Sequence, residues 1–336
     1  MFKYILRRLL LMIPTLLGMT FLLFAVVRFA PGLTTAGGQF AAGVMKSRQA
    51  QRRQEQFIAR RLHLVGKNGR PIALPMQYLL WLRSTCEGHF GTSLEYNEPV
   101  LKLIAQRLPV TLTYNLISLL LVYIIAIPGG MLAAVKRGGW FDRGFGIFTL
   151  ALYSLPVILV GSLLLGFLAN PQYLKWFPSA GLHATNTQNM TYFQYLGDYL
   201  YHITLPVACL TYGGFAYLVK QVRGSMLENM RQDFVRTARA KGLKDSTVLI
   251  RHVFRNSLLP LITISAGILP GLLGGSVVVE QIFSIKGMGA LAYSATYSRD
   301  LPVIQTIALI GGVITLLSYL ITDLCYTIAD PRVSYD

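Results

Sequence analysis

Long apolar runs alternate with short charged segments along most of the chain. Each run lacks Lys, Arg, Asp and Glu and reaches the ~20 residues that a helix needs to cross a bilayer. The runs cover residues 9–27, 108–135, 144–168, 199–219, 256–279 and 301–322. The pattern therefore predicts an all-α integral membrane protein with six transmembrane helices, one for each run.

Composition agrees with a membrane protein. Of the 336 residues, 53% are hydrophobic and 13% are charged, whereas an ordinary soluble domain carries about 25% charged residues. The net charge is +17, which on such a chain favours contact with lipid headgroups over binding of nucleic acid. Two of the three cysteines lie within apolar runs, so no disulfide framework is indicated.

Basic segments orient the spans. The N-terminus holds Lys3, Arg7 and Arg8, and the segments 136–143 and 220–255 are also basic. The positive-inside rule places all of them, together with the C-terminus, in the cytoplasm. The outer loop before the second run is basic too, but loops longer than ~60 residues largely escape that rule. The first run is longer than a signal-peptide core and no cleavage site follows it, so we expect an uncleaved anchor.

These boundaries predict four parts. We expect an N-terminal transmembrane helix at 1–29, a large outer loop at 30–107, a core of five helices at 108–328 and a short cytoplasmic tail at 329–336. Within the outer loop, residues 49–64 have few helix breakers and are expected to form an amphipathic helix. Its basic face either contacts a partner or is solvated.

The spans carry no acidic residue in their interiors, although transporters driven by protons or sodium usually carry one there. His202, Glu280 and Asp323 lie at span ends and are expected to reach water. The sequence also lacks the G-x-x-x-x-G-K-[ST] phosphate loop and the motifs of zinc proteases, hydrolases and thiol oxidoreductases. If the chain transports a solute, the energy is therefore expected to enter from elsewhere than its own spans.

The second inner segment has a helical pattern of its own. Apolar side chains recur about every four residues from 226 to 234, as on one face of a single helix. Gly242 is placed to end that helix in a left-handed turn, and Asp245 or Ser246 is placed to cap a second helix over 247–254. Such a basic helix–turn–helix can dock on a cytoplasmic partner, lie on anionic lipid or bind DNA. The flanking spans argue against DNA, and the residue pattern alone leaves docking and lipid open.

At this segment the chain resembles a known family. "RTARAKGL" with "RHVFRNSLLP" is similar to the cytoplasmic loop of ABC-importer permeases in the dipeptide/oligopeptide/nickel family. General importer permeases begin this loop with E-A-A-x-x-x-G. Here Arg236, Thr237 and Ala238 stand at the first three places and Gly242 at the glycine. The Arg and the Thr depart from the general pattern and agree with the peptide-transporter branch.

The resemblance covers nearly the whole chain. It includes "YILRRLLLMIPTLLGMTFLLFAVVRFAPG" at the first span, "PMQYLLWL" and "GHFGTS" in the outer loop, "RLPVTLTYNL" at the start of the core, "GGSVVVEQIFSIKGMG" with "SRDLPVIQ" after the fifth span, and "TIADPR" near the end. His89 and Lys286 stand where the family usually has Asp and Pro. "YLKWFPSAGL" with "YLGDYLYHITLPV" resembles a subfamily that imports oligopeptides and, in some bacteria, the peptide-nucleotide antibiotic microcin C.

The resemblance implies a type I ABC importer permease (MetI-like) core in the bacterial inner membrane, with the large outer loop in the periplasm. It implies a heterodimeric pore formed with a second, related permease. Two ATPase subunits, or one fused ATPase, would dock on the inner side, and a periplasmic binding protein would deliver peptide. ATP and Mg would bind to the ATPases, and this chain is expected to hold no metal or cofactor and to be no enzyme.

The same resemblance implies which residues contact the ATPase. The contact would be made by a coupling loop, residues 220–257, at the positions around its glycine. These positions are Arg236, Thr237, Ala238, Arg239, Ala240, Lys241, Gly242, Leu243 and Lys244.

Polar side chains within the core are candidates for the wall of the pore, since a peptide needs hydrogen-bonding groups along its path. They are Tyr114, Asn115, Tyr153, Ser154, Thr211, Tyr212 and Ser276. Glu280, Arg299 and Asp300 lie near the outer face in this topology and are candidates for an outer gate or for contact with the binding protein. The alternative for these three is a local ion pair on the surface.

Glycines and prolines inside the spans fit either a moving core or close helix packing. They are Pro128-Gly129-Gly130, Pro156, Pro206, Pro270-Gly271, Gly274-Gly275 and Gly311-Gly312. Three other functions remain as alternatives: a self-sufficient channel or secondary transporter, an importer of nickel or another small solute, and a membrane scaffold or enzyme. The first of these predicts transport by the purified chain alone.

Overall fold

The computed structural model describes residues 2–29, 72–187 and 189–329. The amphipathic helix expected at 49–64 and all but the first residue of the expected tail lie outside the described residues. The chain forms two compact units. The first consists of Met1–Leu108 with Ala290–Leu316, and the second of Pro109–Gly289 with Leu317–Asp336.

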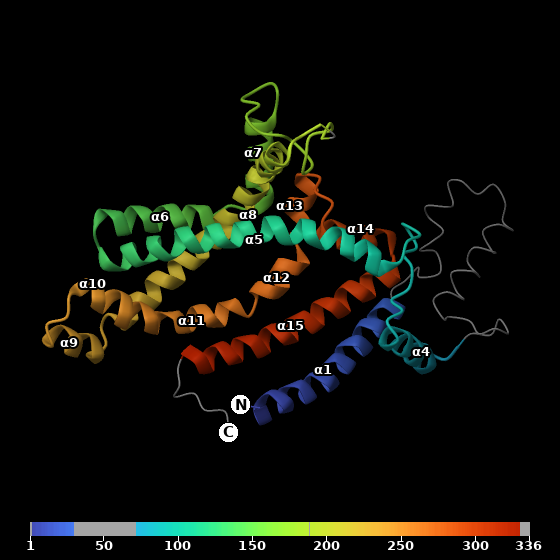
Figure 1. Ribbon diagram of the computed structural model, residues 1–336, viewed down its shortest axis with the longest axis horizontal. Coiled ribbons are helices and arrows are strands. Elements are labelled where there is room, and N and C mark those ends of the chain that lie inside the picture. The colour runs from blue at the N-terminus through green and yellow to red at the C-terminus, as the bar shows by residue number, and fades with distance from the viewer. Residues whose placement is uncertain (1, 30–71, 188, 330–336) are drawn as a thin grey trace. The chain divides into compact units, whose positions relative to one another are not determined.

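Helices make up most of the described chain (Figure 1). Two of them, η2 and η3, are π-helices, which have i→i+5 hydrogen bonds. In chain order the elements are α1 (Phe2–Phe29), α4 (Leu74–Cys86), α5 (Val100–Val135), α6 (Trp140–Ser154), α7 (Val157–Leu164), η2 (Leu165–Ala169), α8 (Tyr192–Asn229), α9 (Asp233–Ala240), α10 (Asp245–Thr247), η3 (Val248–Phe254), α11 (Arg255–Ser265), α12 (Ile268–Gly274), α13 (Val277–Ile282), α14 (Met288–Ser298) and α15 (Leu301–Ala329).

Every predicted span falls on helices. Among the described residues, four helices are long and apolar enough to cross a membrane, namely α1, α5, α8 and α15. The number rises to six if each of two bent helix pairs is counted as one span. Several helices extend beyond the apolar runs, because backbone hydrogen bonds, and not apolar side chains, define where a helix ends. For example, α8 continues past the fourth run to Asn229.

The third span is not the single straight helix that the apolar run predicted. Its two parts, Trp140–Ser154 and Val157–Ala169, are bent by 93° relative to one another. Pro156 has no amide hydrogen to donate and disfavours helical geometry in the residue before it. Leu155 accordingly has extended backbone angles, φ −83° and ψ 124°.

The fifth span is interrupted as well. It is divided into α11, α12 and α13, with breaks at 266–267 and 275–276. Gly275, in the second break, has φ 69°, a left-handed conformation that favours glycine. By contrast, α5 and α8 run on through Pro128 and Pro206, so a proline in the sequence did not by itself mark a break.

Glycines within the second unit allow helices to approach closely. A Cβ atom at Gly130 of α5 would lie 2.8 Å from Val222 of α8, and one at Gly129 would lie 2.9 Å from Phe145 of α6. Such contacts leave no room for a side chain, which supports close packing as the role of these glycines.

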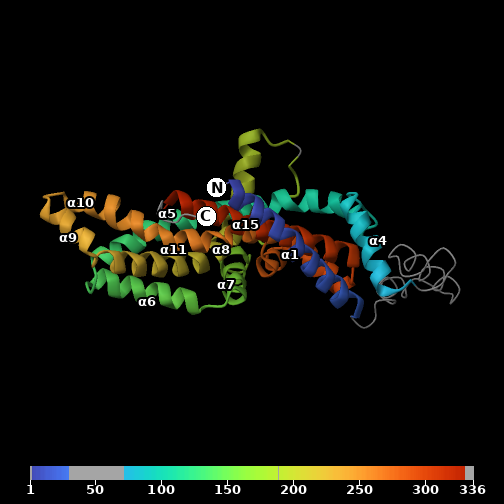
Figure 2. The ribbon, with the colours of Figure 1, turned by 90° about the horizontal axis from the view of Figure 1, so that it is seen from below.

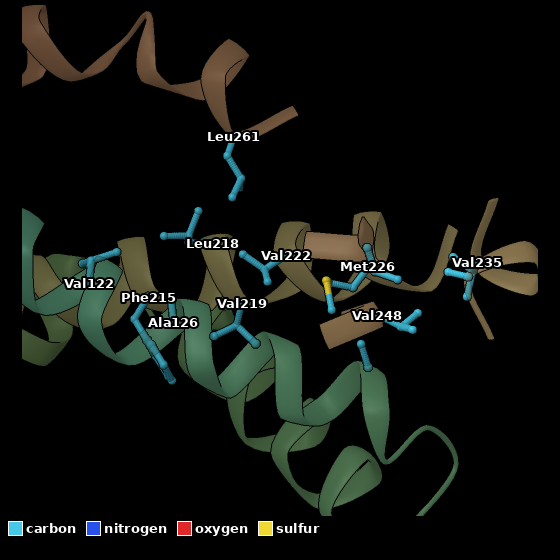
Figure 3. Packing of buried hydrophobic residues seen from close by; sticks show 13 residues of the cluster. Val122, Ala126, Phe215, Leu218, Val219, Val222, Met226, Val235, Val248 and Leu261 are labelled. Atoms are coloured by element: carbon cyan, nitrogen blue, oxygen red, sulfur yellow. The ribbon is translucent and has the colours of Figure 1, made fainter. Parts of the chain in front are cut away.

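Two apolar clusters form the core of the second unit. The larger joins α5, α8, α9, η3 and α11 through buried side chains that include Val222 and Met226 (Figure 3). The other contains Tyr114, Ile203 and Phe283, from α5, α8 and the end of α13. The larger cluster surrounds the base of the second inner segment, so that segment is part of the core and not a free loop.

In the first unit, aromatic rings pack α1 against α4. Phe21 and Phe24 of α1 lie edge-on to Tyr78 of α4, with ring centroids 5.5 Å apart in both pairs. The Tyr78 hydroxyl is also 3.0 Å from the Thr20 hydroxyl. These contacts fix the segment "PMQYLLWL" on the N-terminal helix.

Candidate functional site

The turn around Gly242 lies at one end of the second unit, as both ribbon views show (Figures 1 and 2). α9 ends in a left-handed turn in which Gly242 has φ 75°. The Gly242 amide donates to the Arg239 carbonyl at 2.9 Å, and the Leu243 amide donates to the Ala238 carbonyl at 3.4 Å. Together these bonds form a Schellman motif. The predicted glycine end of this helix is confirmed.

Two predictions about the flanking helices are wrong. The apolar pattern from 226 to 234 belongs to two helices, since α8 ends at Asn229 and α9 begins at Asp233. The next helix begins at Asp245 and not at 247, and the residue before it, Lys244, makes no capping hydrogen bond with its side chain. Backbone amides near the turn bond to backbone carbonyls instead. The amides of Gly242 and Leu243 donate within the Schellman motif, and the Val248 amide donates to the Lys244 carbonyl at 3.0 Å.

Apolar side chains attach the turn to the core. Val235 and Ala238 of α9 are buried in the larger cluster together with Val248 and Val253 of η3 and Met226 of α8 (Figure 3). Of the nine residues predicted to couple to an ATPase, Ala238 is buried and the other eight are exposed. The turn therefore has a fixed apolar base and a solvent-facing surface.

That surface is predominantly basic. Arg239 lies 3.2 Å from Asp245 across the turn, and Arg236 lies 3.5 Å from Asp233 on α9. Both pairs are exposed, so each contributes about 0–1 kcal/mol. Lys241 adds a positive charge beside Gly242, which suits a surface that meets an acidic or polar partner.

Two of the polar residues predicted to line the pore donate hydrogen bonds to backbone carbonyls near breaks in the helices. The Asn115 amide donates to the Leu272 carbonyl at 3.1 Å, near the end of α12. The Tyr212 hydroxyl donates to the Leu155 carbonyl at 2.9 Å, at the bend beside Pro156. Unpaired carbonyls in a membrane cost several kcal/mol, roughly, so these side chains stabilise irregular backbone within the core.

The other pore candidates are distributed over several environments. Thr211 shares a hydrogen bond of 3.1 Å with Ser118, which the sequence did not single out. Ser276 accepts from the Val279 amide at 3.4 Å and so caps α13. Ser154 donates to a carbonyl of its own helix, and Tyr153 is 62% exposed. Of these four residues, only Ser276 caps a helix, and it does so at the break at 275–276.

Glu280 was expected to reach water, but the structure shows that it is buried. Its carboxylate accepts from the hydroxyls of Tyr114 and of Thr111, the latter at 3.1 Å. Thr111 in turn accepts from the Met288 amide at 2.8 Å. A Cβ atom at Gly287 would lie 2.5 Å from the carboxyl group. The pore candidate Tyr114 is itself fully buried and holds this carboxylate.

Asp300 is buried as well, at the start of α15 in the first unit. It accepts from the Ser93 hydroxyl at 2.5 Å and from the Leu94 and Glu95 amides at 2.9 and 3.2 Å. Arg299, beside it, has φ 56°. The alternative of a surface ion pair is wrong for the two carboxylates Glu280 and Asp300, because both are 1% exposed or less.

A further polar cluster was missed at the start of α8. Asp198 lies 3.0 Å from His183 and 3.2 Å from His202. His202 was expected to reach water, but it is 9% exposed and bonds to the Asp198 carbonyl at 2.8 Å. The spacing of Asp198 and His202 by one helical turn was a signal for this pair.

Comparisons with known proteins agree with this architecture. The family model described as "binding-protein-dependent transport system inner membrane component" matches residues 126–335. An oligopeptide transport system permease protein, AppB, of Bacillus subtilis (strain 168) is 38% identical, covering all of both chains. An inner membrane ABC transporter permease protein, YejB, of Escherichia coli O157:H7 is 35% identical and covers 99% of each chain.

The fold is also similar to a solved structure. A chain of the MetNI methionine ABC transporter, in an inward-facing conformation, has a TM-score of 0.54 and 18% sequence identity. The similarity covers 69% of this chain and 99% of that one, which supports the predicted MetI-like core. Because the family model matches more than half of the chain and the relatives align over its whole length, the protein belongs to the family of binding-protein-dependent transport system inner membrane components, the permease subunits of ATP-driven importers.

Proposed function

We propose that this permease imports peptides, forming half of the translocation pore, and that it couples to its ATPases through the turn around Gly242. The substrate class is supported by relatives aligned over 99% or more of the chain that are named as oligopeptide or peptide permeases. The coupling role is supported by one structural observation, the exposed basic turn fixed to the core by buried apolar side chains.

The proposed assembly contains this chain, a second homologous permease, two ATPase subunits or one fused ATPase, and a periplasmic peptide-binding protein. ATP and Mg bind to the ATPases, and this chain contributes no catalytic residue. It lies in the bacterial inner membrane with both termini in the cytoplasm. Thiol labelling tests the orientation in a chain whose three native cysteines are replaced by Ser, because Cys86 is exposed and lies close to Gly88. A membrane-impermeant reagent should then reach Gly88→Cys, and not Gly138→Cys, in intact cells with the outer membrane permeabilised.

The connection between the turn and the membrane helices supports the proposed coupling role. The turn is bonded to α9 by the Schellman motif, and the chain after it is helical from Asp245 through η3 and α11 to Ser265. Val235 and Val248 on either side of the turn are buried against Met226 of α8. A displacement of the turn by the ATPases would therefore be carried to two membrane helices at once.

Substitution at Gly242 tests the coupling role, with a matched control elsewhere in the chain. Gly242 and Gly138 have φ 75° and 76°, and a Cβ atom at either would meet no atom within 4 Å. Gly242→Arg and Gly138→Arg thus impose the same left-handed strain of about 1–2 kcal/mol on two turns that we place on the same side of the membrane. The measurement is co-purification of the ATPases and the second permease with the tagged chain.

We expect Gly242→Arg to lose the ATPase and keep the second permease, while Gly138→Arg keeps both. Equal loss in the two variants would mean general damage and would refute a specific coupling surface. If the wild-type chain purifies alone and still transports peptide in liposomes, the ABC mechanism itself is wrong and the channel alternative holds.

We extend the proposal to the cargo and its path. The pore wall would include the polar residues Asn115, Thr211 and Tyr212. Glu280, Arg299 and Asp300 would each contribute either to an outer gate or to contact with the binding protein. The cargo would include peptide-nucleotide antibiotics of the microcin C type. Cells lacking this chain should then resist microcin C and fail to grow on oligopeptides as the source of a required amino acid; unchanged sensitivity would refute the antibiotic as cargo.

A further inference from the structure

A cavity between α6 and α8 has no place in the mechanism proposed above. Its volume is about 930 Å³. Apolar side chains form most of its walls, among them Phe145 and Leu150 from α6 and Ala216 and Val219 from α8. Leu150 is 60% exposed, so the cavity is open along its apolar side.

One end of the cavity is charged. It is lined by Asp142, Arg143, Lys220 and Arg223, a net of two positive charges. Arg223 and Asp142 form a two-pronged ion pair, with distances of 2.5 and 2.8 Å, that joins the two helices. The side chains of Arg143 and Lys220 are exposed and have no ion-pair partner among residues 72–187 and 189–329. This end of the cavity therefore has an excess of positive charge, which suits an anionic ligand.

The cavity has the length of one lipid leaflet. The charged end begins at Arg143, and the apolar wall of α6 extends to Tyr153, a distance of about 15 Å at the ~1.5 Å rise of a helix. Half of a ~30 Å hydrocarbon core is also about 15 Å. An acyl chain lying along this wall would place a headgroup at Arg143 and Lys220.

Glycines keep the cavity open. Gly146 of α6 and Gly224 of α8 both line it, and a Cβ atom at either would meet no atom within 4 Å. Unlike Gly129 and Gly130, these glycines are therefore not required for contact between helices. Their effect is to leave space on both walls.

We propose that this cavity binds one anionic phospholipid, with its phosphate at Arg143 and Lys220 and an acyl chain along the apolar walls of α6 and α8. The match between a cationic end and an apolar channel of leaflet length favours this occupant, because basic pockets between membrane helices bind anionic headgroups. The lipid belongs to the inner leaflet in the topology proposed above. The site does not depend on which cargo the importer carries.

The test uses the complex purified through the full-length chain and reconstituted in phosphatidylcholine nanodiscs with added phosphatidylglycerol. Native mass spectrometry counts the phosphatidylglycerol molecules that stay bound. Arg143→Gln with Lys220→Gln should weaken binding about 30-fold, from the loss of two cations near the membrane surface, and should remove one bound lipid. Lys136→Gln with Arg137→Gln removes the same charge from residues that do not line the cavity and should keep that lipid.

A second pair of variants tests the apolar part. Gly146→Leu fills the cavity and should remove the bound lipid whatever its headgroup. Gly144→Leu is the control, because Gly144 lies on the same helix, has the same open surroundings and does not line the cavity. Retention of phosphatidylglycerol in both cavity variants would overturn the proposal. It would also be overturned if a cysteine at Leu150 cross-linked to the second permease, since protein and not lipid would then cover the cavity.

Discussion

The hydrogen bond between Tyr114 and Glu280 offers a quantitative test of how the core is held together. Both side chains are fully buried, and Glu280 accepts hydrogen bonds from Tyr114 and Thr111 of the same helix. Hydrogen bonds to charged groups contribute about 1.5–3 kcal/mol. Tyr114→Phe removes one of these two donors without opening a cavity, so we expect it to lower the free energy of unfolding by about 2 kcal/mol.

A double-mutant cycle separates this bond from other effects of substitution. The cycle combines Tyr114→Phe with Glu280→Gln, and the free energy of unfolding is measured by denaturant titration in mixed micelles. We expect a coupling energy of about 1.5 kcal/mol, because the two groups are in direct contact in the interior. Tyr212→Phe is the comparison; it removes a hydroxyl that bonds to a neutral carbonyl and should cost about 1–3 kcal/mol, because that carbonyl is left without its donor. A coupling energy under about 0.5 kcal/mol would refute the reasoning.

Three further predictions follow from close contacts and buried charges. Gly130→Ala should destabilise the protein by about 1–3 kcal/mol, since its Cβ would lie 2.8 Å from a side chain of α8, while Gly213→Ala, which meets no atom within 4 Å, should be neutral or stabilising in thermal unfolding. Asp300→Asn should speed hydrogen exchange at the Leu94 amide, which donates to this carboxylate at 2.9 Å, by about tenfold or more for a loss of ~1.5 kcal/mol; unchanged exchange would contradict that bond. Arg299→Glu should lower the ATPase activity that the binding protein stimulates, and unchanged stimulation would remove Arg299 from the proposed gate.

The apolar runs were enough to predict the membrane helices and not their breaks. The length of a run without charged residues shows whether the segment is able to cross the hydrocarbon core of a bilayer. All six runs fall on helices. A helix breaks only where lost backbone bonds are replaced, which depends on side chains distant in sequence. At the bend beside Pro156, the Tyr212 hydroxyl bonds to the Leu155 carbonyl, whereas Pro206 lies within a continuous helix.

The site shows the same division between local and distant determinants. The role of Gly242 as a helix end followed from its position after an apolar helix, because the left-handed turn is a local property of glycine. The buried states of Glu280 and Asp300 could not be predicted, since their donors lie on segments more than 160 residues away along the chain. A charged residue at the end of an apolar run therefore predicts a surface position from the sequence alone, whereas these two carboxylates are buried.

The π-helix η3 stands directly between the basic turn and the fifth membrane span. A π-helix contains an extra residue in its turn relative to an α-helix, and one residue of an α-helix corresponds to a rotation of about 100°. If residues 248–254 changed to α geometry, the turn would rotate about the axis of α11 by roughly that angle while the chain remained helical throughout. Such a change of helix geometry would alter the orientation of the basic turn and leave the covalent path from the turn to the fifth span fully helical.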